Sequence, residues 1–412
     1  MNQSFLIFGR EPSVSFAELY QYLGDDKQKI VLAAPAGAII DDEFLGKDAP
    51  LQLAGVIKSG VVAKTLDKLT AEDLAEVLQG LVKADGKLHF GLSLYNLCYP
   101  GQNRPLTPSL VKEGALKRLG LEIKSILKAA GRSVRLVESR SGNLSSVDVA
   151  KNKLLRTGVE LCIFVTTDGF LIGKTEAVQP FEEYSHRDYD RPGRDAKSGM
   201  LPPKLALAMI NMAIGAYRNT PLHILDPFCG SGTVLQEALL LGHKVTGTDI
   251  DEQAVINSKM NLEWLKNDVG ALPDWRVEQA DVRHSNKILS PQSMDAIVTE
   301  FDLGPPLQGG ESVGKIDSIV FSLSDFYFDA LRALHPFLKP GSRAVVAWPH
   351  FRIQGVLVST FSKLRDLGWS VVVPYPAEFE KIFPLSERGT LLYGRPDQHV
   401  GREILLLKKS GS

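Results

Sequence analysis

Two short stretches in the middle of the chain restrict its fold more than any other feature. The first, DPFCGSGT from Asp226 to Thr233, ends an apolar run and turns sharply on glycines. The second, KVTGTDID from Lys244 to Asp251, ends another apolar run in the acidic residue Asp249. A glycine-rich turn after one strand lets a ligand approach the backbone, and an acid one strand further on can bind ribose hydroxyls. Together they predict one nucleotide-cofactor pocket.

The residues of the turn indicate which cofactor it binds. A dinucleotide site would show the spacing G-x-G-x-x-G, with a helix N-terminus aimed at a pyrophosphate. Here the turn runs from Cys229 to Thr233 and follows Asp226. Because a buried acid disfavours a phosphate and favours a cation, the turn suits S-adenosylmethionine, which has a sulfonium, a charged amine, a ribose diol and no phosphate. The alternative is an ordinary glycine-rich strand-to-helix turn, with Cys229 as a small packing residue.

Strands and helices alternate along the second half of the chain. Strands are predicted at residues 222–225, 244–248, 275–279, 294–299, 342–348, 371–373 and 403–408, and helices at 205–217, 233–241, 252–265, 319–338 and 356–367. The helix from residue 319 is expected to end at Lys339-Pro340-Gly341. This alternation predicts an α/β fold of the Rossmann-like type, a doubly wound and mostly parallel sheet with an antiparallel edge.

The first half of the chain has a different pattern, which is typical of a mixed α+β domain. Strands are predicted at residues 4–9, 89–97, 134–137, 161–166 and 170–178, and helices at 14–23, 70–83 and 109–130. The sequence therefore predicts an N-terminal α+β region at 1–179, a linker with a leading helix at 180–220, and a cofactor-binding domain at 221–412.

The composition limits the number of domains, the partners and the cellular location that can be expected. The 412 residues suggest two or three domains, and a formal net charge of −1 means that any nucleic-acid surface must be local. The 3 cysteines form no C-x-x-C pair, which argues against a disulfide framework and a zinc site. No apolar run is long enough to cross a bilayer, and the first residues do not resemble a signal peptide. We therefore expect no metal, no membrane partner and a cytoplasmic location.

In a parallel sheet of this type, ligands collect at the carboxyl ends of the strands. The acids at the strand ends are expected to bind the ribose through Asp249 and the adenine amine through Asp281, while Asp226 shapes the methionine end of the pocket. For Asp281 alone, a helix N-cap is the alternative. The full set of predicted cofactor residues is Asp226, Pro227, Phe228, Gly230, Gly232, Thr233, Asp249, Ile250, Asp281, Val282 and Thr299.

The end of the fourth strand is where we expect chemistry. An exocyclic amine on a base is a poor nucleophile, because its lone pair is delocalised into the ring. Glu300 can accept the hydrogen bonds of that amine and Phe301 can stack on the base. With Asp302, these are the predicted catalytic residues. The alternative is that Glu300 caps the following loop and Phe301 belongs to the core.

Local basicity is concentrated before the predicted cofactor domain. Residues 112–156 contain eleven lysines and arginines but four acids. Such an excess is a candidate phosphate-binding face, although a solvated helical face would look the same. A second basic set lies on the loop that precedes the predicted helix at 205–217, where its members could instead pair with neighbouring aspartates. The candidate phosphate-binding residues of the two sets are Lys117, Arg118, Lys124, Arg132, Arg135, Lys151, Lys153, Arg187, Arg194 and Lys197. The family resemblance given next implies that their partner is RNA.

Several of these segments resemble one known family. The DPFCGSGT and VTGTDID stretches, together with RDYDRPGRDAKSGMLPPKLALAMINMA, resemble the THUMP-domain RNA guanine-N2 methyltransferases of the Trm-eleven and archaeal Trm-G-ten type. FLIFGREPSVSFAELY resembles their N-terminal domain, and SGNLSSVDVAKNKLL resembles their THUMP module. The resemblance implies a THUMP-type RNA-binding region before a methyltransferase that transfers a methyl group from S-adenosylmethionine to guanine N2 in tRNA.

One departure from that family concerns the fourth strand. The family motif is Asp-Pro-Pro-Tyr, whereas this chain has Glu300-Phe301-Asp302-Leu303. The acid is lengthened and both prolines, which would stiffen the backbone, are absent. Two other functions therefore stay open: a non-catalytic subunit that binds the cofactor and RNA, and an amino methyltransferase acting on DNA or ribosomal RNA. The target nucleotide, the oligomeric state and a small activating subunit also stay open.

Overall fold

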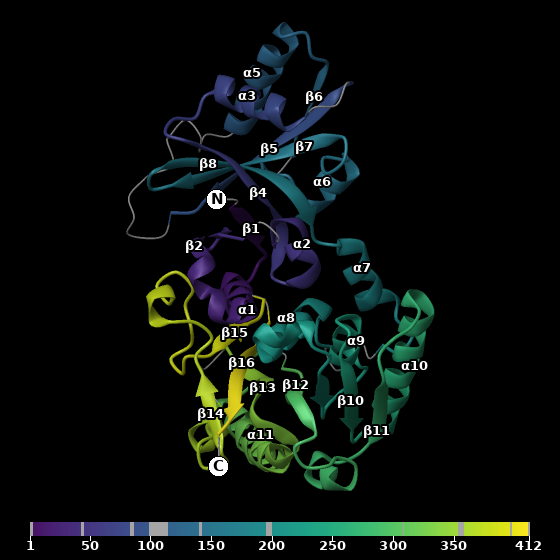
Figure 1. The fold of residues 1–412 in the computed structure, drawn as a ribbon. Helices are drawn as coiled ribbons and strands as arrows, with labels where there is room; N and C mark the ends of the chain where they lie inside the picture. The colour runs from purple at the N-terminus through teal and green to yellow at the C-terminus, as the bar shows by residue number, and fades with distance from the viewer. Residues whose placement is uncertain are drawn as a thin grey trace. The chain divides into compact units, whose positions relative to one another are not determined.

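The protein is described by a computed structural model, in which residues 3–42, 45–82, 86–98, 114–139, 142–194, 200–307, 309–352, 358–395 and 398–410 are defined. Within these ranges the chain forms two compact units (Figure 1). The first comprises residues 1–16, 26–181 and 381–383, and the second comprises 17–25, 182–380 and 384–412. Each unit has its own eight-stranded sheet.

The first unit is an α+β fold, as the sequence predicts. Its strands, in the spatial order β2-β3-β1-β4-β8-β7-β5-β6, are β1 (Ser4–Phe8), β2 (Ile30–Ala34), β3 (Gly37–Ile40), β4 (Val56–Leu66), β5 (Leu88–Asn96), β6 (Val134–Val137), β7 (Gly158–Thr166) and β8 (Gly169–Val178). Strand β5 is parallel to β6 and β7, and the other pairs are antiparallel. The sequence analysis missed β2, β3 and β4.

The helices of this unit are α1 (Pro12–Leu23), which continues into the second unit, α2 (Leu45–Gln52), α3 (Ala71–Leu81), α5 (Ala115–Ala129) and α6 (Ser146–Lys151). Helix α3 begins where Thr70 accepts a hydrogen bond from the Asp73 amide, 3.1 Å away. The apolar faces of α3 and α5 pack on β5 and β7 through residues such as Leu74, Ile123 and Phe90.

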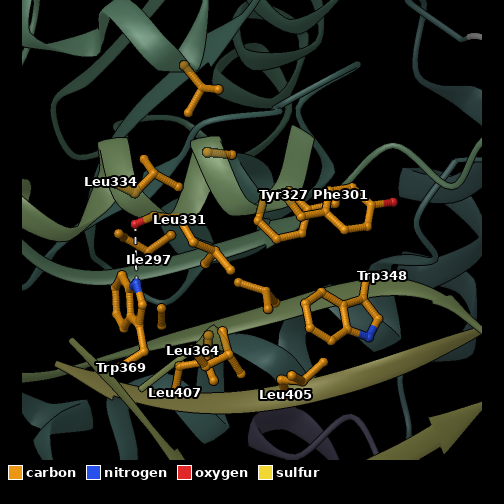
Figure 2. Close-up of a cluster of buried hydrophobic side chains, with 14 of the residues drawn as sticks. Ile297, Phe301, Tyr327, Leu331, Leu334, Trp348, Leu364, Trp369, Leu405 and Leu407 are labelled. Atoms are coloured by element: carbon orange, nitrogen blue, oxygen red, sulfur yellow. Dashed lines mark hydrogen bonds between the residues drawn. The ribbon is translucent and has the colours of Figure 1, made fainter. Parts of the chain in front are cut away.

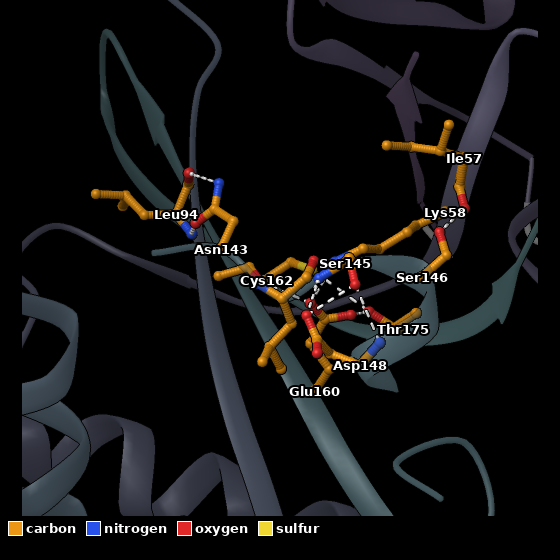
Figure 3. Close-up of polar contacts among 12 residues, drawn as sticks. Ile57, Lys58, Leu94, Asn143, Ser145, Ser146, Asp148, Glu160, Cys162 and Thr175 are labelled. Atoms are coloured by element: carbon orange, nitrogen blue, oxygen red, sulfur yellow. Dashed lines mark hydrogen bonds and ion pairs between the residues drawn. The ribbon is translucent and has the colours of Figure 1, made fainter. Parts of the chain in front are cut away.

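A buried ion pair ties the centre of this sheet together (Figure 3). Lys58 Nζ of β4 lies 2.6 Å from Glu160 Oε1 of β7, and the two side chains are 1% and 0% exposed. The hydroxyls of Ser93 and Thr175 each donate to Glu160 at 2.6 Å. Lys58 Nζ also donates to the Leu144 carbonyl at 2.5 Å, just before helix α6. Because both charges are hydrogen-bonded on several sides, their burial is sustainable.

The second unit has the predicted Rossmann-like fold. Its sheet has the order β11-β10-β9-β12-β13-β16-β14, with β15 paired to β16. The strands are β9 (His223–Asp226), β10 (Lys244–Asp249), β11 (Trp275–Gln279), β12 (Met294–Glu300), β13 (Leu338–Phe351), β14 (Trp369–Val372), β15 (Leu391–Tyr393) and β16 (Val400–Lys409). The first five strands in this order are parallel. The antiparallel strand β16 lies between β13 and β14, one position inside the predicted edge.

The helices of this unit are α7 (Phe181–Ser185), the π-helical turn η2 (His186–Asp190), α8 (Pro203–Ile214), α9 (Thr233–Leu240), α10 (Glu252–Val269) and α11 (Val313–Leu334). Short 3-10 helices are η1 (Gly24–Lys29), η3 (Gly215–Asn219), η4 (Val282–Lys287), η5 (His335–Phe337), η6 (Ser359–Lys363) and η7 (Ala377–Phe379). Leu331 and Leu334 of α11 pack on Ile297 of β12 and Leu405 of β16 in the main core (Figure 2).

Two of the predicted helices differ from the structure. Helix α11 begins at Val313, where Ser312 caps it, and ends at Leu334 because Pro336 cannot continue an α-helix. The described part of the predicted helix 356–367 holds only η6. There the Ser359 amide donates to Ser324 Oγ, and Thr360 Oγ1 donates to the Ser324 carbonyl, so local side-chain bonds compete with a regular helix.

Candidate active site

The carboxyl ends of β9, β10, β11 and β12 surround a cavity of about 1240 Å³. Parallel pairing brings these ends together: Gly247 of β10 lies opposite Asp226 of β9, and Asp249 lies opposite Gln279 of β11. Pockets for one small ligand measure roughly 300–1000 Å³. This cavity therefore has room for a cofactor together with part of a second substrate.

Most of the predicted site residues line this one cavity. They are Asp226, Pro227, Phe228, Gly230, Thr233, Asp249, Ile250, Asp281, Val282, Glu300, Phe301, Asp302 and Arg194. Two predicted cofactor residues lie behind its wall instead. Thr299 is fully buried, and a Cβ on Gly232 would lie 2.5 Å from Ser258 Oγ. These two therefore support the wall through packing and hydrogen bonding.

Asp226 is a buried acid without a cationic partner. Its Oδ1 accepts hydrogen bonds from Thr299 Oγ1 at 2.6 Å and from the Phe228 amide at 3.2 Å. The pKa of Asp226 is raised to about 7, mainly by burial; the carboxylates of Asp249 and Glu300 contribute to this rise, and the hydrogen bonds from Thr299 and Phe228 oppose it. Among the described lysines, arginines and histidines, none forms an ion pair with it. A positively charged ligand would supply the missing countercharge.

Asp249 organises the glycine turn. Its Oδ2 accepts from the Gly230 amide at 2.9 Å, and its Oδ1 accepts from the Asp251 amide at 3.0 Å. Gly230 has φ +50°, and a Cβ there would meet no atom within 4 Å. The turn thus exposes backbone to the cavity. Each carboxylate oxygen of Asp249 keeps a further lone pair for a hydroxyl group.

Asp281 is a helix N-cap, which is the alternative role that the sequence analysis gave for it. Its Oδ1 accepts from the Arg283 amide at 2.9 Å at the start of η4. The Arg283 guanidinium also pairs with it at 2.5 Å and lowers its pKa. Asp281 still lines the cavity. A ligand amine would therefore share this carboxylate with Arg283.

The end of β12 differs from the prediction in one respect. Phe301 is 1% exposed, and its ring stacks on Tyr327 at 4.9 Å within the core (Figure 2). Its predicted role in stacking on a base is corrected, because protein atoms already cover the ring. The half-buried aromatic rings of the cavity wall are Phe228 and Phe326, which meet edge to face at 5.6 Å.

The two acids of this segment have different surroundings. Glu300 forms an ion pair with Arg402 of β16, and burial raises its pKa while Arg402 lowers it in part. Asp302 is exposed; its Oδ1 accepts from the Gly304 amide at 2.9 Å, and its carbonyl accepts from the Tyr327 hydroxyl. Both line the cavity. Neither Arg402 nor Tyr327 was found by sequence reasoning, since each lies far along the chain.

The segment from Arg191 to Gly193 is hydrogen-bonded to the glycine turn and to helix α10. Asn261 of α10 accepts from the Gly193 amide at 2.7 Å and donates to the carbonyls of Gly193 and Ser231 at 2.8 Å. Arg191 is 2% exposed and donates to Thr233 Oγ1 at 2.7 Å. The only sequence signal for these contacts was a polar Asn on the buried face of a predicted helix.

The second basic set is divided by the structure. The prediction that Arg187 binds RNA is wrong. Its guanidinium forms a bidentate pair with the buried Glu237, at 2.6 and 3.2 Å, and the side chain is only 12% exposed. Its partner is none of the neighbouring aspartates that the sequence suggested. Arg194 lies over the Tyr189 ring at 5.4 Å and lines the cavity. Lys197 lies outside the described residues.

The first basic set lies on the first unit. Lys117, Arg118 and Lys124 are on α5, Arg132 and Arg135 are at β6, and Lys151 and Lys153 are at α6. Most are exposed, Lys124 and Arg132 being half-buried. Lys117 pairs with Glu138 at 2.9 Å, and Arg132 donates to the Val82 carbonyl at 3.1 Å. The structure therefore leaves a largely exposed cationic surface there.

The fold and the cavity define a class I, Rossmann-like methyltransferase domain. Residues 191–355 match the family model of UPF0020, described as the RMKL-like methyltransferase domain. S-adenosylmethionine is the methyl donor of such domains, and an unpaired buried acid beside an open glycine turn fits a sulfonium ligand. In the described chain no helix is long and apolar enough to cross a membrane.

Curated relatives narrow the family. The chain is 31% identical over 125 residues to the "Probable tRNA (guanine(10)-N2)-dimethyltransferase" of Methanothermococcus thermolithotrophicus, covering 30% of this chain and 72% of that protein. It is 31% identical over 201 residues to the tRNA (guanine(10)-N2)-dimethyltransferase of Methanothermobacter thermautotrophicus, covering 48% of this chain and 53% of that protein. The chain thus spans about half the length of the latter. It belongs to the family of methyltransferases that these proteins represent.

A solved structure extends the likeness to both units. TrmN from Thermus thermophilus has a TM-score of 0.54 at 18% identity, over 99% of this chain and 100% of that one. At this identity the likeness concerns the fold alone. It supports the predicted arrangement of an α+β region followed by a Rossmann-like methyltransferase domain.

Proposed function

We propose that this protein is an S-adenosylmethionine-dependent RNA methyltransferase that modifies an exocyclic base amine, with guanine N2 of tRNA as the first candidate. The observation that carries the proposal is Asp226, a buried carboxylate without a cationic partner beside an open glycine turn, in a UPF0020 methyltransferase domain. The names of the curated relatives supply the acceptor.

The strand-end residues would hold the donor. Asp226 and the turn at Gly230 would bind its amino-acid end, Asp249 its ribose, and Asp281 with Val282 its adenine. When bound, the donor supplies an electrophilic methyl group on a sulfonium. The carboxylates around the cavity would favour that positive charge over an anionic nucleotide.

The end of β12 would hold the acceptor. Glu300 and Asp302 offer oxygens to the N–H groups of the base amine, and Phe228 and Phe326 offer partly exposed rings beside them. Holding the amine in line with the methyl group would supply most of the rate, because orientation replaces a bimolecular encounter. This chemistry needs no metal.

The first unit would bind the RNA. We assign a THUMP-type module to the α+β region 1–179, a linker and leading helix to 180–220, and the methyltransferase to 221–412. The basic residues of α5, β6 and α6 would contact phosphates. A tRNA substrate and three cysteines that form no disulfide suit a cytoplasmic location. A small activating subunit is a separate hypothesis, decided by whether the pure chain is active alone.

The test is transfer of a labelled methyl group to bulk tRNA by the purified chain. We expect label in tRNA, identified as N2-methylguanosine by nucleoside mass spectrometry, and its loss in Glu300→Ala. Ribosomal RNA and DNA run in parallel as acceptors. Label in either of these instead of tRNA contradicts the assigned substrate.

A non-catalytic subunit is the second candidate, favoured by the replacement of the family motif Asp-Pro-Pro-Tyr by Glu300-Phe301-Asp302-Leu303. It predicts calorimetric binding of S-adenosylmethionine with no transfer to any nucleic acid. Absence of donor binding by folded protein contradicts both candidates.

A further inference from the structure

Glu300, the acid at the end of β12, needs a cationic partner if its carboxylate is to accept hydrogen bonds from a base amine. Its side chain is 16% exposed and has Asp226 and Asp302 as acidic neighbours at the ends of β9 and β12. A glutamate in such a place would favour its protonated form, and a protonated carboxyl accepts hydrogen bonds less well. It also has three rotatable bonds, so nothing in its own chemistry fixes its direction.

Arg402 meets both requirements from a distant strand. It lies on β16, opposite Pro349 of β13, and its side chain is 7% exposed. Its Nε donates to Glu300 Oε1, across 102 residues of sequence. Within the described chain, Glu300 Oε2 has no hydrogen-bond partner, and Glu300 lines the cavity. One oxygen is therefore fixed while the other is left for a ligand.

The neighbouring contacts keep this arrangement rigid. The residue after Arg402, Glu403, accepts from Trp348 Nε1 at 2.7 Å and from Thr390 Oγ1 at 2.6 Å, so β16 is fixed on both sides. Tyr327 stacks between Phe301 and Trp348 and donates to the Asp302 carbonyl (Figure 2). The backbone on the far side of Glu300 is thus held as well, without any proline in the segment.

We infer that Arg402 is a positioning residue, which holds the Glu300 carboxylate ionised and directs its free oxygen to the acceptor amine. The inference rests on the proposed methyltransferase function. It adds the residue that keeps Glu300 ionised and oriented so that Glu300 can accept a hydrogen bond from the amine. Arg402 itself does not touch the substrate. The charged and titratable groups around Glu300 are Asp226 of β9, Asp302 after β12, Tyr327 of α11 and Arg402 of β16.

The first experiment needs no turnover. Infrared titration of the full chain follows the carbonyl stretch of protonated carboxyl groups, and subtraction of the Glu300→Gln spectrum assigns the Glu300 band. In Arg402→Met we expect this band to persist to a pH higher than in the wild type by about one unit or more, because the opposite charge is lost. In Arg402→Lys, which keeps the charge, the band should return towards the wild-type position. An unchanged band in Arg402→Met overturns the inference.

The second experiment is the pH profile of kcat/KM for transfer to tRNA. Only ionised Glu300 accepts hydrogen bonds from the amine well. Arg402→Met should therefore move the acidic limb of the profile to higher pH by as much as it moves the infrared band, and Arg402→Lys should restore the limb in part. A loss of rate that is equal at every pH indicates a purely structural residue and overturns the inference. Donor binding by calorimetry confirms that each variant is folded. Wild-type protein that binds the donor but transfers nothing overturns the proposed function, whereas transfer with an unmoved limb overturns only the role of Arg402.

Discussion

The carboxylate of Asp226 accepts a hydrogen bond from the hydroxyl of Thr299, 2.6 Å away, and the two side chains are 2% and 0% exposed. They join the ends of β9 and β12, two neighbouring parallel strands. This hydrogen bond links the two strand ends beside the cavity, and the charge at this point depends on whether Asp226 is ionised.

Replacing Asp226 by Asn should stabilise the free protein at neutral and alkaline pH. The folded protein holds the pKa of Asp226 at about 7, against the ordinary aspartate value of 3.8, so this group's stabilising contribution is complete at low pH and is lost as pH rises through 7. The advantage of Asp226→Asn should therefore grow between about pH 4 and about pH 7, to at most about 4 kcal/mol. Chemical denaturation across this range measures it. Asp317→Asn, an exposed acid on α11, is the matched control and should show no such trend.

The same substitution should weaken binding of the donor. Loss of the carboxylate removes a charge-assisted contact, typically about 1.5–3 kcal/mol, or about tenfold to a hundredfold in affinity. Calorimetry with S-adenosylmethionine at neutral pH measures this effect. A variant that is stabler and yet binds equally well would show that the donor does not contact Asp226.

Replacing Asp249 by Asn should disturb the glycine turn and the ribose contact together. The amide keeps one acceptor oxygen, so one of the bonds to Gly230 and Asp251 is lost with the negative charge. We expect affinity for S-adenosylhomocysteine to fall about tenfold or more. Glu252→Gln, at the exposed start of α10, keeps the turn and should bind as the wild type does. Equal affinity of the two variants for S-adenosylhomocysteine would show that Asp249 does not contact the cofactor.

Replacing Lys58 by Met should destabilise the first unit strongly. Glu160 would stay buried without its countercharge, which typically costs about 3–5 kcal/mol. The double variant Lys58→Met/Glu160→Gln should recover part of this loss. Lys64→Met on the same strand removes an exposed pair with Glu76 and should cost less than about 1 kcal/mol. Urea unfolding of the full chain, followed by circular dichroism, compares the four proteins.

Removing Lys124 and Lys128 from the surface of α5 should weaken tRNA binding and its dependence on salt. Each phosphate contact that is lost should lower the slope of log K against log salt by about 0.7–0.9. Fluorescence anisotropy with labelled tRNA at several salt concentrations gives the slope. The pair Lys259→Ala and Lys266→Ala on α10 carries the same charge change on the second unit. An equal loss in both variants would mean that only net charge matters.

Local signals in the sequence predicted the part of the site that lies on consecutive strands and turns. The acids Asp226 and Asp249 end their strands, because an apolar run followed by glycine or aspartate defines where a parallel strand stops. The order of β16 in the sheet was not accessible in this way. Its position between β13 and β14 depends on long-range pairing, so the Arg402 contact with Glu300 could not be read from spacing.

Burial was the second limit of sequence reasoning. Phe301 and Arg187 have residue types that suit a base and a phosphate, yet the fold covers both, the first with Tyr327 and the second with Glu237. Residue type indicates what a side chain can bind. Tertiary packing decides whether that side chain stays available to a ligand or is already occupied by another residue of the protein.

The place of β16 in the sheet has a consequence during synthesis. Translation produces β12 and β13 well before β16, and Glu300 precedes Arg402 by 102 residues. A nascent chain that has not yet reached β16 has no partner for this acid and leaves the edge of β13 unpaired. The inferred role of Arg402 therefore couples completion of the β12 strand end to the addition of β16, the last strand of this sheet in the sequence.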